Sequence, residues 1–322
     1  MGGAADAGLL DVGDGHRVRW QVSGDPDGAP ALVLHGGPGS GADAGWRRLL
    51  DPDAYRVVLL DQRGCGRSTP HAGDRHVDLS AQTTQHLVAD VERLREHLGV
   101  ESWLLLGGSW GTTLALAYAQ AHPERVSAAV LFSVTTTTRR EVEHVTRGLR
   151  THLPREWERF AAGVPPDERD GDLATAYARL LHHPDPAVHE PAALAWCRWE
   201  DAHVDPVGAR AAGDGWADQR YADPRFRLAF ARLVTHYWSH AAFLPDGQLL
   251  RGVADLGHVP AVLLHGRDDL GSPLAVAEQL AATWPGARLE VVDDAGHGAG
   301  PAMTRAVVAA TDRLREVLRH RR

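Results

Sequence analysis

The stretch Gly107-Gly108-Ser109-Trp110-Gly111 decides the fold of this chain. An apolar run over residues 103–106 precedes it, and small and apolar residues follow it from 112 to 121. This pattern predicts a strand, a sharp turn and a helix. The glycines at 107 and 111 let the turn pass close to its neighbours. Ser109 can then adopt a strained backbone conformation, with its hydroxyl exposed at the end of the strand.

Strands and helices alternate on both sides of this stretch. Residues 31–34, 55–60 and 126–132 are short apolar runs, and residues 83–98 carry leucine and valine at helical spacing. Residues 16–22 alternate between polar and apolar side chains and predict a half-buried edge strand. Strands that alternate with helices in this way predict a mainly parallel central sheet with helices on both faces.

The alternation stops after residue 135. From about 136 to 255 the sequence has helical segments, proline-rich breaks and five of the ten tryptophans, without a run typical of a buried strand. Strands are expected again over 261–265 and 289–292, with helices around 274–283 and 304–319. We expect residues 1–135 and 256–322 to form one α/β domain, into which residues 136–255 are inserted as a helical cap.

The loops that follow the last two expected strands, 261–265 and 289–292, carry the partners that a serine nucleophile requires. A serine hydroxyl needs a base that takes its proton and an acid that orients the base. The strand over 261–265 ends in Gly266-Arg267-Asp268-Asp269, and the strand ending at 292 leads to a loop with a Gly-flanked His297. We expect His297 to be the base and Asp269 its orienting carboxylate, with Asp268 as the alternative.

A glycine-rich loop follows the apolar run 31–34. Its sequence, His35-Gly36-Gly37-Pro38-Gly39, is too rich in glycine and proline for regular structure, so its backbone amides are accessible. Negative charge that develops on a substrate oxygen needs preorganised donors. We expect the backbone N–H groups of Gly37 and Trp110 to form this oxyanion hole.

Composition and charge exclude several classes of function. The 322 residues carry a net charge of −8, which gives no basic footprint for nucleic acid. No apolar run approaches the length of a membrane span, and the first six residues lack the features of a signal peptide. Two cysteines, Cys65 and Cys197, are too few for a disulfide framework, and Cys65 is expected as a small buried thiol. We expect a cytoplasmic protein with no nucleic-acid or membrane partner.

Three motifs together resemble those of the proline iminopeptidases, which are serine peptidases of the α/β-hydrolase fold. They are the loop at 35–39, the segment Asp61-Gln62-Arg63-Gly64-Cys65-Gly66-Arg67-Ser68, and residues 107–118. The resemblance spans nearly the whole chain and is weakest in the cap. It implies an α/β-hydrolase fold and release of an N-terminal residue, usually proline, from a short peptide or small molecule. The reaction would pass through an acyl-enzyme without a metal or cofactor.

The resemblance also implies how substrate binds. In that family a cap carboxylate in the motif Trp-x-x-Trp-Glu holds the free amino group, and residues 196–200 match it, which implies Glu200 as the amine anchor. Trp199 and Gly36 are implied as further substrate-binding residues. The family's second glutamate, in Arg-x-Glu-x-His-Tyr, is replaced here by Val234. Either another acid takes its place, or the preferred substrate has no such amine; the candidate acids are Asp201, Asp205 and Glu190.

Two other functions stay open at this point. The first is a hydrolase on the same framework that cleaves an ester, lactone or amide of a small molecule without a free amine, which Val234 favours. The second is a binding protein that keeps only the fold, and intact Ser109, Asp269 and His297 argue against it. Epoxide hydrolases and haloalkane dehalogenases of this fold use an aspartate nucleophile, a mechanism that Ser109 excludes.

Overall fold

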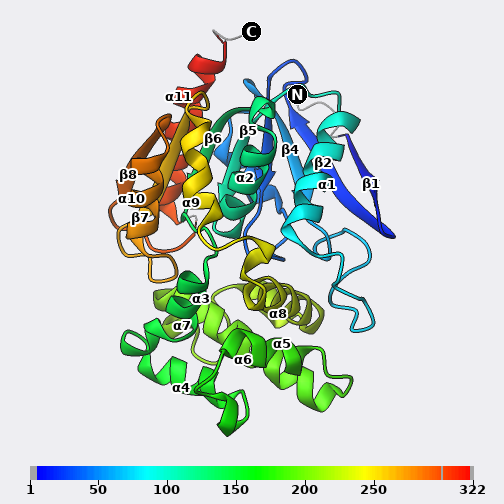
Figure 1. Ribbon diagram of the computed structural model, residues 1–322, viewed down its shortest axis with the longest axis vertical. Coiled ribbons are helices and arrows are strands. Elements are labelled where there is room, and N and C mark those ends of the chain that lie inside the picture. The colour runs from blue at the N-terminus through cyan, green and yellow to red at the C-terminus, as the bar shows by residue number, and fades with distance from the viewer. Residues whose placement is uncertain (1–5, 299, 320–322) are drawn as a thin grey trace.

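An eight-stranded sheet organises the computed structural model, which describes residues 6–298 and 300–319 (Figure 1). Its spatial order is β1-β2-β4-β3-β5-β6-β7-β8. Strands β3 to β8 run parallel, whereas β1 and β2 are antiparallel to their neighbours. The predicted α/β fold with a mainly parallel sheet is confirmed. The strands are β1 (Ala7–Gly13), β2 (His16–Gly24), β3 (Ala29–Leu34), β4 (Tyr55–Asp61), β5 (Trp103–Gly108), β6 (Val126–Phe132), β7 (Ala261–Gly266) and β8 (Ala287–Val292).

The N-terminal edge of the sheet differs from the prediction. Residues 16–22 were expected as an edge strand, but they belong to β2, which pairs with β1 on one side and with β4 on the other. The edge strand is β1, which the sequence did not reveal. Within β1, the consecutive residues Leu9 and Leu10 are both apolar, although Leu9 is 49% exposed. The alternation of polar and apolar residues that usually indicates a half-buried strand is therefore missing from the sequence.

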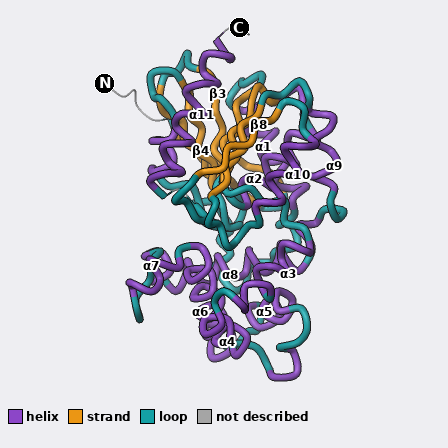
Figure 2. Tube along the Cα trace, turned by 90° about the vertical axis from the view of Figure 1, so that its left-hand side faces the viewer, coloured by secondary structure: helices purple, strands orange, loops and turns teal. Residues whose placement is uncertain are grey.

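Helices cover both faces of the sheet (Figure 2). One face carries α1 (Thr84–His97), α2 (Trp110–Ala121), α9 (Gln248–Gly252) and α10 (Leu274–Thr283), and the other carries α11 (Pro301–Arg319) and a short 3₁₀ helix, Ala44–Leu49. Every residue of β5 and β7 is buried. A strand covered on both faces must be apolar on both, which is why β5 reads as a continuous apolar run.

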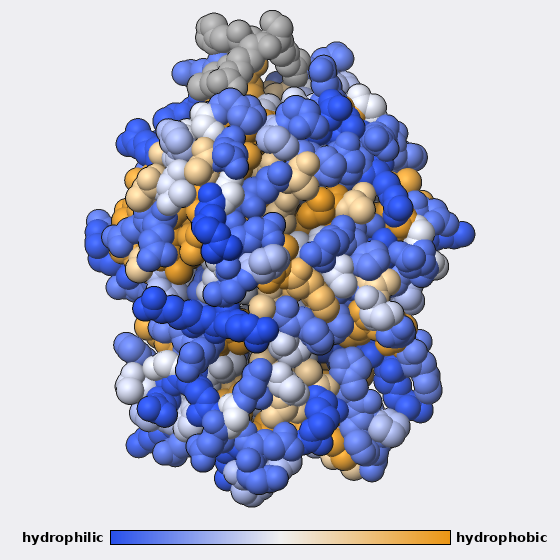
Figure 3. Space-filling view, viewed as in Figure 1, coloured by the Kyte–Doolittle hydropathy of each residue, from blue (hydrophilic) through white to orange (hydrophobic). Residues whose placement is uncertain are grey.

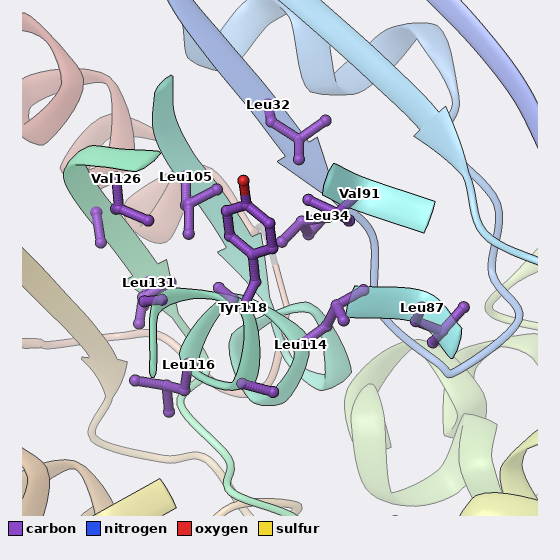
Figure 4. Close-up of a cluster of buried hydrophobic side chains, with 14 of the residues drawn as sticks. Leu32, Leu34, Leu87, Val91, Leu105, Leu114, Leu116, Tyr118, Val126 and Leu131 are labelled. Carbon is purple, nitrogen blue, oxygen red and sulfur yellow. The ribbon is translucent and has the colours of Figure 1, made fainter. Parts of the chain in front are cut away.

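The core between the sheet and α1 and α2 is made of aliphatic side chains around one tyrosine (Figure 4). Leu105 of β5 and Leu114 of α2 are both fully buried there. The ring of Tyr118 lies among these side chains, and its hydroxyl donates to Glu92 Oε2 at 2.7 Å. This packing fixes α2, and with it the turn that α2 begins from, against the centre of the sheet.

A separate layer of helices lies across the carboxyl ends of the parallel strands, at the bottom of Figure 1. These helices are α3 (Arg139–Thr146), α4 (Pro154–Ala162), α5 (Leu173–Leu181), α6 (Pro186–Val204), α7 (Pro206–Ala212) and α8 (Pro224–Ser239). They share a hydrophobic cluster of their own, in which Phe160 stacks on both Tyr177 and Trp199. α9, although it falls within 136–255, packs against α2 and α10 beside the sheet.

Buried polar contacts join this helical layer, which we call the cap, to the loops of the sheet domain. Arg232 of α8 is 2% exposed and donates to the backbone oxygens of Ala72, Asp74 and Val77 at 2.7 to 2.9 Å. His144 of α3 reaches the backbone oxygen of Leu270 at 2.9 Å. Because Arg232 itself is buried and its three backbone partners belong to the sheet domain, these contacts help to fix the cap over the strand ends.

The surface in the view of Figure 3 is mostly hydrophilic, with apolar side chains in small patches. Across the part of the chain that the structure describes, no helix combines the length and the hydropathy that a membrane span requires.

Candidate active site

The turn between β5 and α2 holds Ser109 in a strained conformation, with φ of 53° and ψ of −125°. Glycine is required on both sides of it. A Cβ on Gly111 would lie 1.9 Å from the backbone oxygen of Leu34, and one on Gly107 would lie 2.6 Å from the backbone oxygen of Gly111. No L side chain fits such distances without moving backbone, so the glycine spacing seen in the sequence is a steric requirement of this turn.

Ser109, His297 and Asp269 form one hydrogen-bonded line. Ser109 Oγ lies 2.8 Å from His297 Nε2, and His297 Nδ1 lies 3.0 and 2.9 Å from the two carboxylate oxygens of Asp269. Asp269 follows β7 and His297 follows β8, so the parallel register brings both loops to the end of β5. Asp268 is exposed, whereas the Asp269 side chain is 1% exposed. Asp269, and not the alternative Asp268, is therefore the carboxylate that contacts the imidazole of His297.

The surroundings of Asp269 keep it ionised. Burial alone would raise the pKa of Asp269, but the charge of His297 and the hydrogen bond to it, with help from His265 and the Ser272 amide, hold that pKa below its usual value. Burial lowers the pKa of His297, but the charge and hydrogen bond of Asp269, with a contribution from Glu200, raise it overall. With Nδ1–H directed at Asp269, the imidazole presents Nε2 to the serine proton.

The glycine-rich loop also lies close to Ser109. The point where a Cβ on Gly36 would lie is 3.3 Å from Ser109 Cβ, and both Gly36 and Gly37 line the cavity in front of the serine. Trp110 is the first residue of α2, so the helix has no carbonyl for its backbone N–H. These positions are suited to bind a negatively charged oxygen.

Gln62 holds the glycine-rich loop in place, a role that the sequence analysis did not assign. Its backbone N–H donates to His35 Nε2 at 3.1 Å, and its side-chain nitrogen donates to the His35 oxygen at 2.9 Å. Its side-chain oxygen accepts from the indole of Trp110 at 2.9 Å. One buried amide thus joins the loop to the start of α2. Gln62 lies in the segment 61–68, one of the three motifs that carry the family resemblance, but the sequence of that segment alone did not reveal which contacts Gln62 makes.

Cys65 lies beside Gln62 and His35. Its sulfur is 3.5 Å from His35 Nε2 and contacts the Gln62 backbone oxygen at 3.3 Å. Cys65 is a buried free thiol, as the sequence predicted, and Cys197 is also free and buried. Burial raises the pKa of both thiols well above the usual value, so neither is a reactive thiolate.

A cavity of about 770 Å³ lies between the strand ends and the cap, with Ser109 and His297 in its wall. Its size is that of sites for drug-sized ligands. Aromatic side chains contribute much of the apolar wall: Trp46, Phe132, Tyr221, Phe230 and Trp238. Within the described residues no group of three or more His, Cys, Asp or Glu side chains is arranged to hold a metal ion.

Glu200 of α6 also lines this cavity, although it is only 6% exposed. Its Oε1 accepts from the indole of Trp196 at 3.2 Å, and its Oε2 lies 3.4 Å from His203 Nε2. Burial raises the pKa of Glu200 to about 7, against opposing effects of His297 and the Trp196 hydrogen bond. A carboxylate in this position is suited to pair with a cation from the substrate.

The structure places the other predicted cap residues elsewhere. Trp199 is 1% exposed, stacks on Phe160 with 5.1 Å between ring centroids, and does not border the cavity in the described part of the chain. It therefore belongs to the cap core rather than to the surface that substrate would meet. Val234 is fully buried in the same cluster, so the position of the family's second glutamate is apolar packing here.

None of the three candidate acids lies at the cavity among the described residues. Asp201 accepts from the amides of Ala217 and Asp218, at 2.8 and 2.9 Å. Asp205 caps α7, and Glu190 is exposed. Glu141 does line the cavity, but its carboxylate accepts from the hydroxyl and amide groups of Thr135, Thr136 and Thr138. Both carboxylate oxygens of Glu141 are therefore already hydrogen-bonded to residues just before α3.

Known proteins resemble this chain in sequence and in fold. The sequence profile described as alpha/beta hydrolase fold matches residues 30–300. A probable proline iminopeptidase of Streptomyces coelicolor is 51% identical over 313 residues, which covers 96% of this chain and 94% of the relative. A proline iminopeptidase of Xylella fastidiosa is 44% identical, with 95% of each chain covered. The crystal structure of proline iminopeptidase from Mycobacterium smegmatis has a TM-score of 0.60 at 22% identity, covers 97% of this chain and 96% of its own, and shares the fold.

Proposed function

The chain belongs to the proline iminopeptidase family of α/β hydrolases, and we propose that it is a serine hydrolase that releases N-terminal proline, or a similar residue, from short peptides. One observation carries the proposal: Ser109, His297 and Asp269 are hydrogen-bonded in line at a cavity that also holds the buried carboxylate of Glu200. Hydrolysis of a small-molecule ester is not favoured, because relatives at 40 to 51% identity are named proline iminopeptidases.

The first half of the reaction forms an acyl-enzyme. Ser109 Oγ attacks the carbonyl carbon of the N-terminal residue while His297 Nε2 takes the hydroxyl proton, and Asp269 stabilises the imidazolium that results. The carbonyl oxygen becomes an oxyanion between the backbone N–H groups of Gly37 and Trp110. When the tetrahedral intermediate collapses, His297 gives its proton to the departing amine, and the peptide leaves one residue shorter.

The second half releases the bound residue. A water molecule gives a proton to His297 Nε2 and attacks the acyl carbon, and the same oxyanion donors stabilise the second intermediate. Its collapse returns the proton to Ser109 Oγ and frees the carboxylic acid. Throughout, Glu200 pairs with the ammonium of the N-terminal residue, which places the carbonyl carbon next to Ser109. A blocked or acetylated N-terminus lacks this charge and is a poor substrate.

Replacing Ser109 by alanine tests the proposal. With prolyl 4-nitroanilide as substrate, Ser109→Ala should lower kcat by about 10⁵- to 10⁶-fold, because the nucleophile is lost while the binding site stays. Circular dichroism and Tm should match the wild type. Ser239→Ala is the matched control, since Ser239 lies on α8 and its hydroxyl bonds within that helix.

Two results would contradict the proposal. One is a Ser109→Ala variant that hydrolyses prolyl 4-nitroanilide at the wild-type rate. The other is a wild-type enzyme that hydrolyses a simple 4-nitrophenyl ester and has equal kcat/KM for prolyl and N-acetylprolyl 4-nitroanilide. That second result would return the small-molecule hydrolase to consideration.

We also propose that the enzyme acts in the cytoplasm on short peptides, without a nucleic-acid or membrane partner. Its two cysteines are free and buried, a state that a reducing compartment preserves. The net charge of −8 supports the expectation that polyanions do not bind. Fractionation of the host cell, followed by assay of prolyl 4-nitroanilide hydrolysis in each fraction, tests the location.

A further inference from the structure

A histidine lies beside the buried carboxylate in the cap. His203 follows Glu200 by one helical turn on α6, is 3% exposed, and lines the same cavity. Its Nε2 lies 3.4 Å from Glu200 Oε2. The spacing of three residues places both side chains on one face of the helix.

The hydrogen bonds of His203 determine which nitrogen carries its proton. Nδ1 lies 2.7 Å from the backbone oxygen of Trp199, which can only accept, so Nδ1 is the donor. Burial, with the nearby charge of His297, lowers the pKa of His203 to about 3, so the ring is neutral. Nε2 then carries a lone pair and can only accept a hydrogen bond. When Glu200 is ionised, two acceptor atoms face each other across 3.4 Å with no proton between them.

A prolyl ammonium has two N–H bonds and therefore needs two acceptors. Glu200 supplies one. The second glutamate of the family is Val234 here, which is buried in the cap core. The other described carboxylates in the cavity wall already have partners: Glu141 accepts from the threonines around it, Asp218 pairs with Arg220, and Asp43 accepts from the Gly45 amide. Two acceptors 3.4 Å apart can both lie about 2.9 Å from a single nitrogen.

We propose that His203 Nε2 is the second acceptor for the substrate ammonium, so that Glu200 and His203 together form the amine-binding site of this enzyme. The inference rests on the proposed function and adds a residue that determines its specificity. One carboxylate and one neutral imidazole carry a single negative charge. That charge balances one ammonium, which is the least costly combination in a buried site.

The pair is close enough to the catalytic histidine for this role. The point where a Cβ on Gly271 would lie is 3.4 Å from His203 Cδ2 and 3.4 Å from His297 Nδ1. In an α-amino acyl group the nitrogen is attached to the carbon next to the carbonyl. A substrate whose carbonyl meets Ser109 must therefore hold its amine within the same cavity, whose wall includes His297, His203 and Glu200. The charge of Glu200 is close enough to His297 to raise the pKa of that histidine.

The test compares two anilides that differ by one group. Prolyl 4-nitroanilide carries the ammonium, and tetrahydrofuran-2-carboxylic acid 4-nitroanilide has the same ring with oxygen in place of N–H. His203→Phe keeps a planar ring without the acceptor. It should lower the ratio of kcat/KM for the prolyl over the ether anilide by about 10- to 100-fold, the usual value of a hydrogen bond to a charged group.

Three further variants make the result decisive. His203→Gln can place its amide oxygen near the position of Nε2 and should keep the ratio within about 3-fold of the wild type. His189→Phe is the matched control, because His189 is a buried histidine on α6 that bonds to a backbone oxygen and does not line the cavity among the described residues. His203→Met also lacks the acceptor and decides the question if the Phe variant does not fold.

An unchanged ratio in a folded His203→Phe or His203→Met variant would overturn the inference, and so would an equal loss in His203→Gln. Neither result touches the proposed function, provided that the wild type still prefers the prolyl anilide. A wild type that does not distinguish the two anilides would instead remove the amine anchor and, with it, the proposed function.

Discussion

Glu200 and His297 must both be free of a proton when an amine substrate is cleaved. A protonated Glu200 has no charge for the ammonium, and a protonated His297 cannot take the proton of Ser109. Burial raises the pKa of Glu200 to about 7. The pKa of His297, although lowered by burial, is raised overall by Asp269. Glu200 therefore gains its proton as the pH falls through about 7, and His297 gains its proton at a higher pH than an ordinary histidine.

We expect the acid side of the pH profile to depend on the substrate. For prolyl 4-nitroanilide, log kcat/KM should approach a slope of two at low pH, because Glu200 and His297 both take up a proton. For the ether anilide the slope should be one, since only His297 matters. Measuring kcat/KM for both substrates from about pH 5 to 9 checks this. Glu200→Gln is the control and should give slope one for both; equal slopes in the wild type would contradict the expectation.

Individual residues were predictable where the chain's own geometry restricts them. Ser109, Asp269 and His297 each follow a strand, in the order that the α/β-hydrolase fold requires. The carboxyl ends of parallel strands meet at one edge of the sheet, so these residues were predicted to meet. Trp199 and His203 show the opposite case. Both lie on α6, and whether a helical residue faces the cap core or the cavity depends on how α6 packs against α8, which the sequence does not state. Trp199 consequently faces the core and His203 the cavity.

At the level of elements, the segment 61–68 after β4 is held by one buried arginine. The Arg63 side chain is fully buried and bonds both carboxylate oxygens of Asp90 on α1, at 2.6 and 2.8 Å. It also donates to the backbone oxygens of Val12 and Ala81, at 3.0 and 3.3 Å. Arg63 thus fastens the segment that contains Gln62 to α1 and to the edge of the sheet.

Removing that arginine should destabilise the fold. Arg63→Met should lower the free energy of unfolding by about 3 to 5 kcal/mol, because Asp90 is left buried and unpaired. Urea unfolding measures the effect. The double variant with Asp90→Leu should regain part of the loss. Arg267→Met is the control: Arg267 pairs with Asp293 at the exposed surface and should change stability by about 1 kcal/mol or less. A loss in Arg63→Met no larger than in the control would contradict the expectation.

The sequence revealed the central elements better than the outer ones. β3, β5, β6 and β7 are covered on both faces, so they had to be apolar runs and were found as such. β1 was missed because its exposed face carries a leucine. In the cap, apolar residues form both the packed core between helices and part of the cavity wall. Their pattern therefore indicated helices but did not show where each helix begins and ends.

At the scale of the whole molecule, the active site is shared between the sheet domain and the cap. The proposed nucleophile and base come from strand ends, and the proposed amine anchor comes from α6. Activity therefore requires the two layers to keep a fixed relation. Arg232 contributes to that relation, because its guanidinium is buried against three backbone oxygens of the loop between β4 and α1.

Arg232→Leu should loosen the cap while leaving the sheet domain folded. The Ala72 carbonyl, which is buried, and the partly buried carbonyls of Asp74 and Val77 would lose their donor, which predicts a loss of about 1 to 3 kcal/mol in the stability of this contact. Amide hydrogen exchange should become faster in α8 than in β5, and KM for prolyl 4-nitroanilide should rise. Arg155→Leu, at an exposed arginine on α4, is the control. Unchanged exchange in α8 would show that other contacts hold the cap.

The two buried thiols make the molecule convenient for optical measurement. Cys65 and Cys197 are 1% and 0% exposed, so dyes that react with thiols should leave the native chain unlabelled. Cysteines introduced at Leu9 on the sheet edge and at Val207 on α7, which are 49% and 75% exposed, would be the sites of attachment. Energy transfer between two dyes there would report the distance from cap to sheet during turnover, without first removing a native cysteine.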